Sequence, residues 1–250
     1  MGKKSTAINY FLFLFLFLLV SITLIVISIH LSKISTVIAS NNSPSIDMPS
    51  LPTIIIDAGH GGEDGGTVGT NGSLEKDLNL KISFDLYELL KCSNIPCILT
   101  RSDDILLYDT TIDYHGRKKA LDLAKRLEIA EKYDNSIFIS IHQNAFSDSK
   151  YSGLQVYYST NDPSSLLLAE KIQLLNKQLL QPENNRKTKA AGENIFLLDR
   201  ISSPAVLVEC GFMSNQQECV LLSTDEYQKK IATVIYASIL DYLENYDFSY

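Results

Sequence analysis

The first fifty residues contain one long apolar run. Residues 10–29 contain only Ser21, Thr23 and Ser28 as polar side chains. At about 1.5 Å per residue, a helix of this length spans the roughly 30 Å core of a bilayer. The apolar region of a signal peptide is shorter, about 7–15 residues. The pattern therefore predicts an uncleaved transmembrane anchor at residues 10–31, between a tail (1–9) and a linker (32–52). A small-residue site ending at Ala39 leaves a secreted form open.

Beyond residue 52, short apolar runs alternate with longer segments of helical periodicity. Buried strands are predicted at residues 53–56, 97–100, 136–141, 154–158 and 206–208. Apolar positions at helical spacing predict helices at 77–92, 117–132, 163–180 and 227–239. Strands joined through helices require crossover connections. Residues 53–250 therefore predict one α/β domain with a mainly parallel, twisted mixed sheet covered by helices on both faces. Residues 103–116 and 181–192 are expected to be loops.

Charge limits the kinds of partner and the orientation in the membrane. Two lysines precede the apolar run and one follows it closely, which places the amino terminus in the cytoplasm and the predicted domain outside. Residues 53–250 contain 19 basic and 28 acidic side chains. Nucleic acid is excluded as a partner, because binding it requires positive charge facing the phosphates. Cys92 and Cys97 flank a predicted turn, so either a disulfide or two free thiols fits their positions.

Polar residues stand where three of the predicted strands end. His60 follows the first strand in a glycine-rich segment, and His142 closes the strand at 136–141. The carboxyl ends of parallel strands form the edge at which ligands bind. Zinc accepts imidazole nitrogen and carboxylate oxygen, and a catalytic zinc site has three protein ligands and one open position. Glu75, just before the helix at 77–92, is the best third ligand. The pattern predicts one zinc ion bound by His60, Glu75 and His142.

Glu209 ends the apolar strand at 206–208. A carboxylate there is costly unless it is paired or functional. Beside a zinc ion, Glu209 can take a proton from the attacking water and pass it to a leaving nitrogen. This arrangement predicts a metal-dependent hydrolase. The alternative is a structural role, in which Glu209 pairs with Arg126 or Lys189 and the two histidines form hydrogen bonds within the core.

Several neighbours are candidates for supporting roles. Asp57 is expected to orient a metal ligand, and Asn144 to bind substrate or loop backbone. His115 is a rival ligand, but nothing in the pattern places it at a strand end. Glu63 and Asp64 are rival carboxylates that we assign to the loop.

The segments around these residues resemble the zinc-dependent N-acetylmuramoyl-L-alanine amidases of the Amidase_3 family over nearly all of residues 53–250. The resemblance implies Zn²⁺ bound by His60, Glu75 and His142, with Glu209 as the catalytic residue. It implies hydrolysis of the amide bond between the lactyl group of N-acetylmuramic acid and L-alanine in peptidoglycan. Arg126 falls where such enzymes commonly have an arginine, and we expect it to contact substrate or a metal ligand.

Within this family the leader and the segments 180–186 and 204–212 look most like the CwlD-type amidases of sporulation and germination. That resemblance implies removal of stem peptides in spore cortex before muramic-δ-lactam formation. It also implies a lipoprotein activator. Two other readings remain open: a zinc peptidase acting within the stem peptide, and a non-catalytic, membrane-anchored wall-binding protein.

Overall fold

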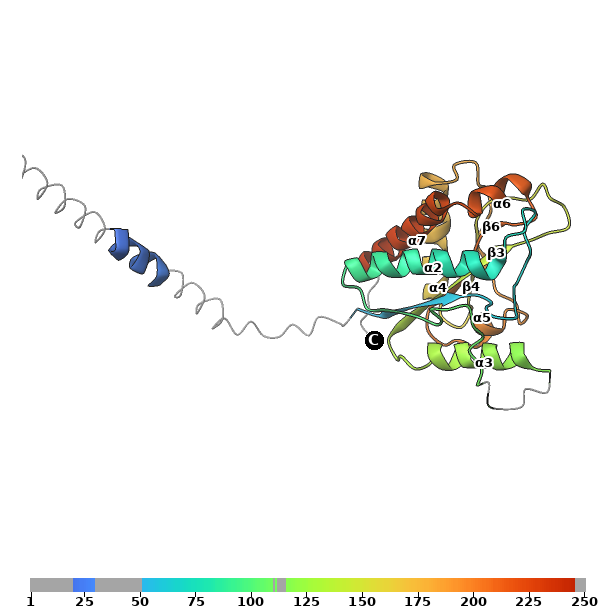
Figure 1. Ribbon diagram of the computed structural model, residues 1–250, viewed down its shortest axis with the longest axis horizontal. Coiled ribbons are helices and arrows are strands. Elements are labelled where there is room, and N and C mark those ends of the chain that lie inside the picture. Colours follow the sequence, from blue (N-terminus) through green and yellow to red (C-terminus); the bar gives the residue numbers. More distant parts are fainter. Residues whose placement is uncertain (1–19, 30–50, 110, 112–115, 246–250) are drawn as a thin grey trace, which may run out of the picture. The chain divides into compact units, whose positions relative to one another are not determined.

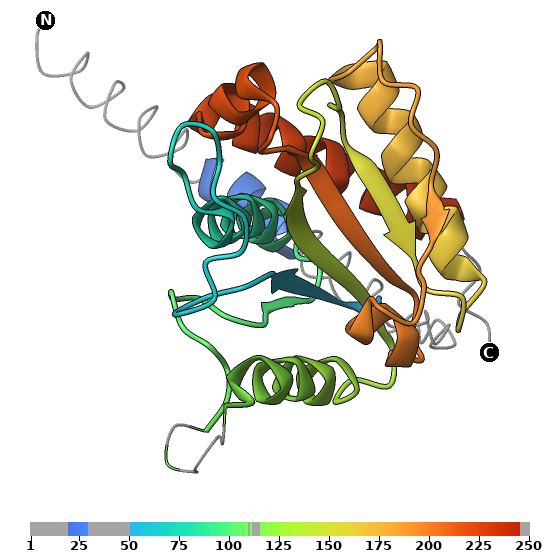
Figure 2. The same ribbon diagram turned by 90° about the vertical axis from the view of Figure 1, so that its right-hand side faces the viewer.

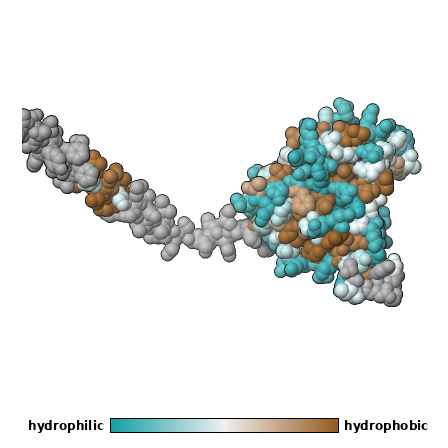
Figure 3. All heavy atoms as spheres, in the orientation of Figure 1, coloured by the Kyte–Doolittle hydropathy of each residue, from teal (hydrophilic) through white to brown (hydrophobic). Residues whose placement is uncertain are grey.

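The computed structural model describes residues 20–29, 51–109, 111 and 116–245. The chain divides into two compact units, residues 1–50 and 51–250. In the first unit, residues 20–29 form a helix whose apolar side chains are exposed (Figure 3). The rest of the predicted anchor at 10–31, the tail and nearly all of the linker lie outside the described residues. Among the helices that are described, none has both the length and the hydrophobicity to cross a bilayer.

The second unit is built on a six-stranded sheet in the order β2-β1-β3-β6-β4-β5 (Figures 1 and 2). The strands are β1 (Thr53–Ala58), β2 (Cys97–Leu99), β3 (Ser136–Asn144), β4 (Gln155–Tyr158), β5 (Lys189–Ala190) and β6 (Ala205–Phe212). β4 runs antiparallel to β6, and the other neighbouring strands are parallel. The prediction of a mainly parallel mixed sheet is confirmed.

Helices cover both faces of this sheet, as predicted. They are α2 (Glu75–Cys92), α3 (Lys118–Ala130), α4 (Ser164–Leu179), α5 (Phe196–Arg200), α6 (Gln216–Leu222) and α7 (Asp225–Asn245). The larger core cluster joins one face of the sheet to α2, α4 and α7, and a smaller cluster joins the other face to α3 and α5 (Figure 2). The site described below lies at the carboxyl ends of the central strands.

The alternation of side chains along the strands decides which face carries the polar residues. Ile54 and Ile56 belong to the larger core cluster and Ile55 to the smaller one. Because successive side chains point to opposite faces, Asp57 continues the side of Ile55, toward α3 and α5. The same alternation gives Ser140 that side in β3. The face of the sheet toward α3 and α5 is therefore polar at its carboxyl edge.

Some elements differ from the sequence prediction. β3 extends to Asn144 and β6 to Phe212, so His142 and Glu209 lie inside strands instead of just at their ends. The β3–β6 ladder continues because His142 pairs with Glu209, and the register then shifts so that Asn144 pairs with Phe212. The hydrogen-bonded pairing of the two strands thus extends beyond the apolar residues from which each strand was predicted. β5, within the expected loop at 181–192, and the short helices α5 and α6 were not predicted.

The cysteines take the simpler of the two arrangements left open by the sequence. Cys92 is exposed, Cys97 is half-buried, and both are free thiols. Cys210 and Cys219 are buried and also free.

Candidate metal centre and active site

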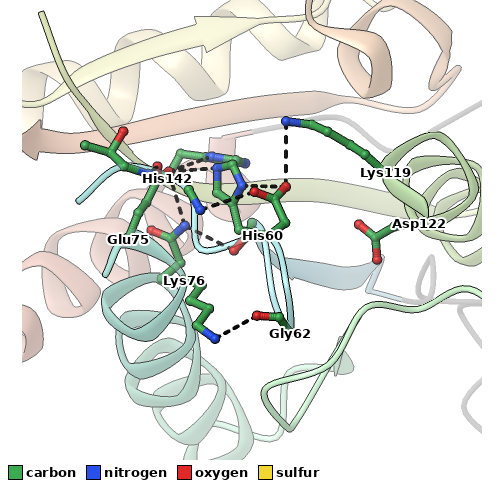
Figure 4. A network of polar contacts seen from close by, with 12 residues as sticks. His60, Gly62, Glu75, Lys76, Lys119, Asp122 and His142 are labelled. Atoms are coloured by element: carbon green, nitrogen blue, oxygen red, sulfur yellow. Dashed lines mark hydrogen bonds and ion pairs between the residues drawn. The ribbon is translucent and has the colours of Figure 1, made fainter. Parts of the chain in front are cut away.

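Two imidazoles and one carboxylate converge at the carboxyl edge of the sheet (Figure 4). Glu75 Oε1 lies 3.2 Å from His60 Nε2 and 3.0 Å from His142 Nδ1. The three residues come from the loop after β1, the first residue of α2 and the end of β3. They form a group able to hold a metal ion, since one ligand atom of each lies within 4.8 Å of the others.

The spacing of these atoms fits a tetrahedral zinc site. Ligands about 2.0–2.1 Å from a tetrahedral zinc ion lie roughly 3.3 Å from one another. The two distances measured from Glu75 Oε1, 3.0 and 3.2 Å, are close to this edge length. Two imidazoles and one carboxylate are also the donor set of some catalytic zinc sites. The residues therefore fit the metal that the sequence predicts.

Glu75 is ionised and held by several donors. Its Oε2 accepts a hydrogen bond from Thr67 N at 2.9 Å, and its Oε1 accepts one from Gln143 N at 3.0 Å. Burial by itself raises the pKa of Glu75. Interactions with His142 and His60 outweigh that effect and hold the pKa well below its ordinary value. The carboxylate is thus charged and fixed in orientation before any cation binds.

Gln143 and Asn79 extend this support behind Glu75. Gln143 Nε2 donates to Asn79 Oδ1 at 3.1 Å, and Asn79 Nδ2 donates to Glu75 Oε1 at 3.4 Å and to Gly59 O at 3.2 Å. The buried amide of Gln143 completes this network. The one feature of the sequence that could have indicated this supporting role is that Gln143 is polar and stands at the end of a predicted strand.

His60 is held in an unusual backbone conformation. Its φ is +62°, a left-handed value that few non-glycine residues adopt. His60 Nδ1 lies 2.9 Å from Asp64 Oδ2, which leaves Nε2 facing Glu75. Lys119 Nζ lies 3.6 Å from the same Asp64 oxygen (Figure 4). Asp64, assigned to the loop from sequence, is thus positioned to orient the imidazole whose Nε2 faces Glu75.

Asp57 and Arg126 form a buried ionic network behind the site. Arg126 Nη1 lies 2.5 Å from Asp57 Oδ1, and Arg126 Nε lies 2.7 Å from Asp122 Oδ2. Arg126 also donates to the carbonyls of Ala58 and His60, at 2.8 and 2.7 Å. Burial opposes the charge on Arg126, but the two carboxylates raise its pKa above the ordinary value. Arg126 therefore fixes the strained His60 backbone and does not pair with Glu209.

We expect Arg126→Gln to destabilise the fold by about 3–5 kcal/mol, because it leaves two buried carboxylates without their cation. Urea denaturation of the full-length protein measures this change. Arg200→Gln is the control, since Arg200 and its partner Asp199 are both substantially exposed and such pairs contribute about 0–1 kcal/mol. Equal stability of the two variants would contradict this account of Arg126.

Gly59 brings the loop after β1 against the second imidazole. A Cβ atom at this position would lie 2.2 Å from His142 Nε2. We expect Gly59→Ala to displace the imidazole and to weaken zinc binding by about 10–100-fold, a loss like that from disturbing a ligand's supporting partners. Competition with a chelator measures the affinity.

The matched control for this substitution is Gly65→Ala in the same loop. Its added Cβ would meet nothing closer than Leu74 Cδ2 at 3.9 Å. Zinc affinity of Gly65→Ala should equal that of the wild type, and the same affinity in Gly59→Ala would show that the close approach is unimportant.

Glu209 faces a cavity beside the three converging residues. The cavity, about 400 Å³ in volume, is lined by His60, His142, Asn144 and Glu209 and by residues of α3 and α5. Glu209 Oε2 is buried, and no described residue donates a hydrogen bond to it. Burial raises the pKa of Glu209 to about 7. A carboxyl group with that pKa can both accept and return a proton near neutral pH.

The other sequence candidates lie elsewhere. Glu63 pairs with Lys118 at the surface. His115 is outside the described residues. Lys189, one of the two proposed partners of Glu209, has its Nζ 5.8 Å from the centroid of the Tyr157 ring.

The fold and the site together define a class of protein: an α/β enzyme with a His-Glu-His group suited to a metal ion and a buried carboxylate at the same cavity. Residues 54–241 match the family described as N-acetylmuramoyl-L-alanine amidase (Amidase_3), and the chain belongs to this family.

Similar proteins agree with this assignment. The germination-specific N-acetylmuramoyl-L-alanine amidase of Bacillus subtilis is 35% identical over 206 residues, which are 81% of this chain and 86% of that protein. The CwlD amidase from Clostridioides difficile, solved in complex with the GerS lipoprotein, is 42% identical with a TM-score of 0.73. That match covers 77% of this chain and 98% of the CwlD chain. AmiC2 of Nostoc punctiforme is 33% identical with a TM-score of 0.65, over 78% and 98% of the two chains.

These relatives confirm two predictions made from the sequence. The chain is an N-acetylmuramoyl-L-alanine amidase, and it is similar in sequence and structure to CwlD-type amidases. The reading as a non-catalytic wall-binding protein is set aside.

Proposed function

We propose that this amidase is zinc-dependent and hydrolyses the amide bond between the lactyl group of N-acetylmuramic acid and L-alanine. The observation that carries this proposal is the convergence of His60 Nε2 and His142 Nδ1 on Glu75 Oε1 at zinc-ligand spacing, beside a cavity that Glu209 faces. When bound, zinc supplies Lewis acidity for the carbonyl and for the attacking water.

Residues of the chain perform the remaining tasks. His60, Glu75 and His142 hold the ion, and Asp64 and Gln143 fix the orientation of His60 and Glu75. Glu209 takes the proton of the attacking water at its buried Oε2 and delivers it to the nitrogen of L-alanine as the amide bond breaks. Asn144 lines the cavity and is placed to bond the substrate.

The biological setting follows from the CwlD-type resemblance. The substrate is peptidoglycan of the spore cortex, from which stem peptides are removed before muramic-δ-lactam forms. The GerS lipoprotein found with the C. difficile CwlD amidase supports a lipoprotein activator for this chain. The apolar stretch at 10–31 anchors the protein in the membrane, with residues 53–250 on the extracytoplasmic side.

Product analysis tests this function. The full-length protein is incubated with zinc and peptidoglycan, with and without a lipoprotein activator, and the released fragments are examined by mass spectrometry and amino-terminal labelling. New L-alanine amino termini are expected. New termini at later stem residues would identify a peptidase, and no new termini under either condition would contradict the proposal.

A further inference from the structure

Two exposed aromatic rings, one buried ring and one guanidinium form a cluster near the site; we name Phe146, Tyr151, Phe212 and Arg186 the aromatic platform. The Phe146 and Tyr151 ring centroids lie 5.0 Å apart, and those of Tyr151 and Phe212 lie 6.3 Å apart. The Arg186 guanidinium lies 4.3 Å from the Phe212 centroid and 5.7 Å from that of Tyr151. Phe146 is 56% exposed and Tyr151 is 38% exposed, whereas Phe212 is 4% exposed. Water therefore reaches two large rings, Phe146 and Tyr151, next to the buried Phe212 ring.

The loop that presents these rings is held by several hydrogen bonds. Phe146 N donates to Ser214 Oγ at 3.0 Å, and Asn215 Nδ2 donates to Ser149 O at 2.8 Å. Arg186 Nε donates to Ser152 O at 2.6 Å. The rings are thus fixed in advance of binding, which lowers the entropic cost of binding a ligand on them.

The platform residues do not line the catalytic cavity, but they are connected to residues that do. Gln155 pairs with Glu209 across the β4–β6 ladder, so the two side chains share a face of the sheet. Arg186 Nη1 donates a hydrogen bond to Gln155 Oε1 at 3.3 Å, so this platform residue contacts the neighbour of Glu209. Phe212 is three residues from Glu209, and Phe146 is four from His142. Chain reach therefore keeps their Cα atoms within about 10 and 14 Å of these site residues.

We propose that the aromatic platform binds sugar rings of the glycan strand next to the muramoyl residue whose amide is hydrolysed. This inference rests on the proposed amidase reaction. The lactyl group is an ether substituent of the sugar, so a sugar ring must lie within a few bonds of the reacting carbonyl. The glycan must then extend beyond the cavity, and the platform is connected to Glu209 through Gln155 and Arg186.

The chemistry of the platform suits a polymer of N-acetylated, β-linked sugars. The C–H faces of such rings are apolar and are buried favourably against aromatic rings. The Arg186 guanidinium has donors for hydroxyl and acetamido groups at the ring edges. A neutral glycan also avoids repulsion by a domain with nine more acidic than basic residues. A lipoprotein docked on the same rings is the competing outcome of the test.

The test uses full-length protein with Phe146→Ala and Tyr151→Ala combined. KM and kcat are measured on intact peptidoglycan and on a single-sugar muramoyl peptide, and the Glu209→Gln background is used for sedimentation with insoluble peptidoglycan. We expect KM for the polymer to rise about tenfold more than KM for the single-sugar substrate. A change of this size corresponds to the loss of one or two contacts between sugar and aromatic rings. Sedimentation should weaken by a similar factor. Leu174→Ala is the control, because Leu174 is an exposed apolar residue on α4.

Three results would overturn the inference. They are equal changes on both substrates, unchanged sedimentation, and loss of lipoprotein activation while polymer binding is retained. Thermal melting confirms that the variant is folded. Wild-type activity on the single-sugar substrate tests the amidase reaction independently, so failure of the platform and failure of the proposed function give different results.

Discussion

Replacing Glu209 with glutamine is expected to lower kcat by about 10²–10⁴-fold while zinc content stays at the wild-type level. The glutamine keeps the shape of the side chain but cannot accept and return a proton, a role that contributes a factor of this size. Glu209 is not one of the three converging residues, so the metal should remain bound. Metal analysis and turnover of peptidoglycan measure the two quantities.

Glu193→Gln is the matched control for this variant. Glu193 is an exposed carboxylate next to Asn194, which lines the cavity, so the substitution makes the same chemical change without touching the proposed proton carrier. Its activity should be that of the wild type. Full activity in Glu209→Gln would remove Glu209 from the mechanism, and loss of zinc from it would assign this residue a ligand role instead.

Replacing Glu75 with glutamine is expected to weaken zinc binding by more than the ~10–100-fold that loss of a ligand's supporting partner costs. Glu75 is the shared neighbour of both imidazoles, and its negative charge would hold the proposed cation between them. Chelator competition on the full-length protein measures the affinity, and activity without added zinc should fall in parallel.

Glu63→Gln is the control for Glu75→Gln. Glu63 lies in the loop between β1 and α2, and it pairs with Lys118 at the surface. Its zinc affinity should be unchanged. A Glu75→Gln protein that binds zinc as tightly as Glu63→Gln would show that the metal lies elsewhere.

The sequence predicted the sheet, the helices on its two faces and the residues that meet at its carboxyl edge. This was possible because each polar residue follows a run of apolar residues whose strand character is clear, as Ile54–Ile56 shows for Asp57 and His60. Neighbouring parallel strands then bring their ends together whatever the separation in sequence. The extension of β3 and β6 was missed because polar side chains interrupt the apolar signal while the backbone ladder continues.

The supporting residues were harder to predict. The proximity of Asp64 to His60 depends on the turn in which His60 has a φ of +62°, and no local pattern specifies that value. Asp122 lies four residues before Arg126, a spacing that places both side chains on one helix face, so this pair was accessible from sequence. The contact between Arg126 and Asp57 depends on tertiary packing, so it could not be predicted from the sequence.

The most direct test of the central claim is zinc-edge anomalous diffraction from crystals of the zinc-loaded protein. We predict one peak about 2.0–2.2 Å from His60 Nε2, His142 Nδ1 and an oxygen of Glu75, with Glu209 facing the remaining coordination position. A zinc peak bound to other residues, or no peak between the two imidazoles, would contradict the account.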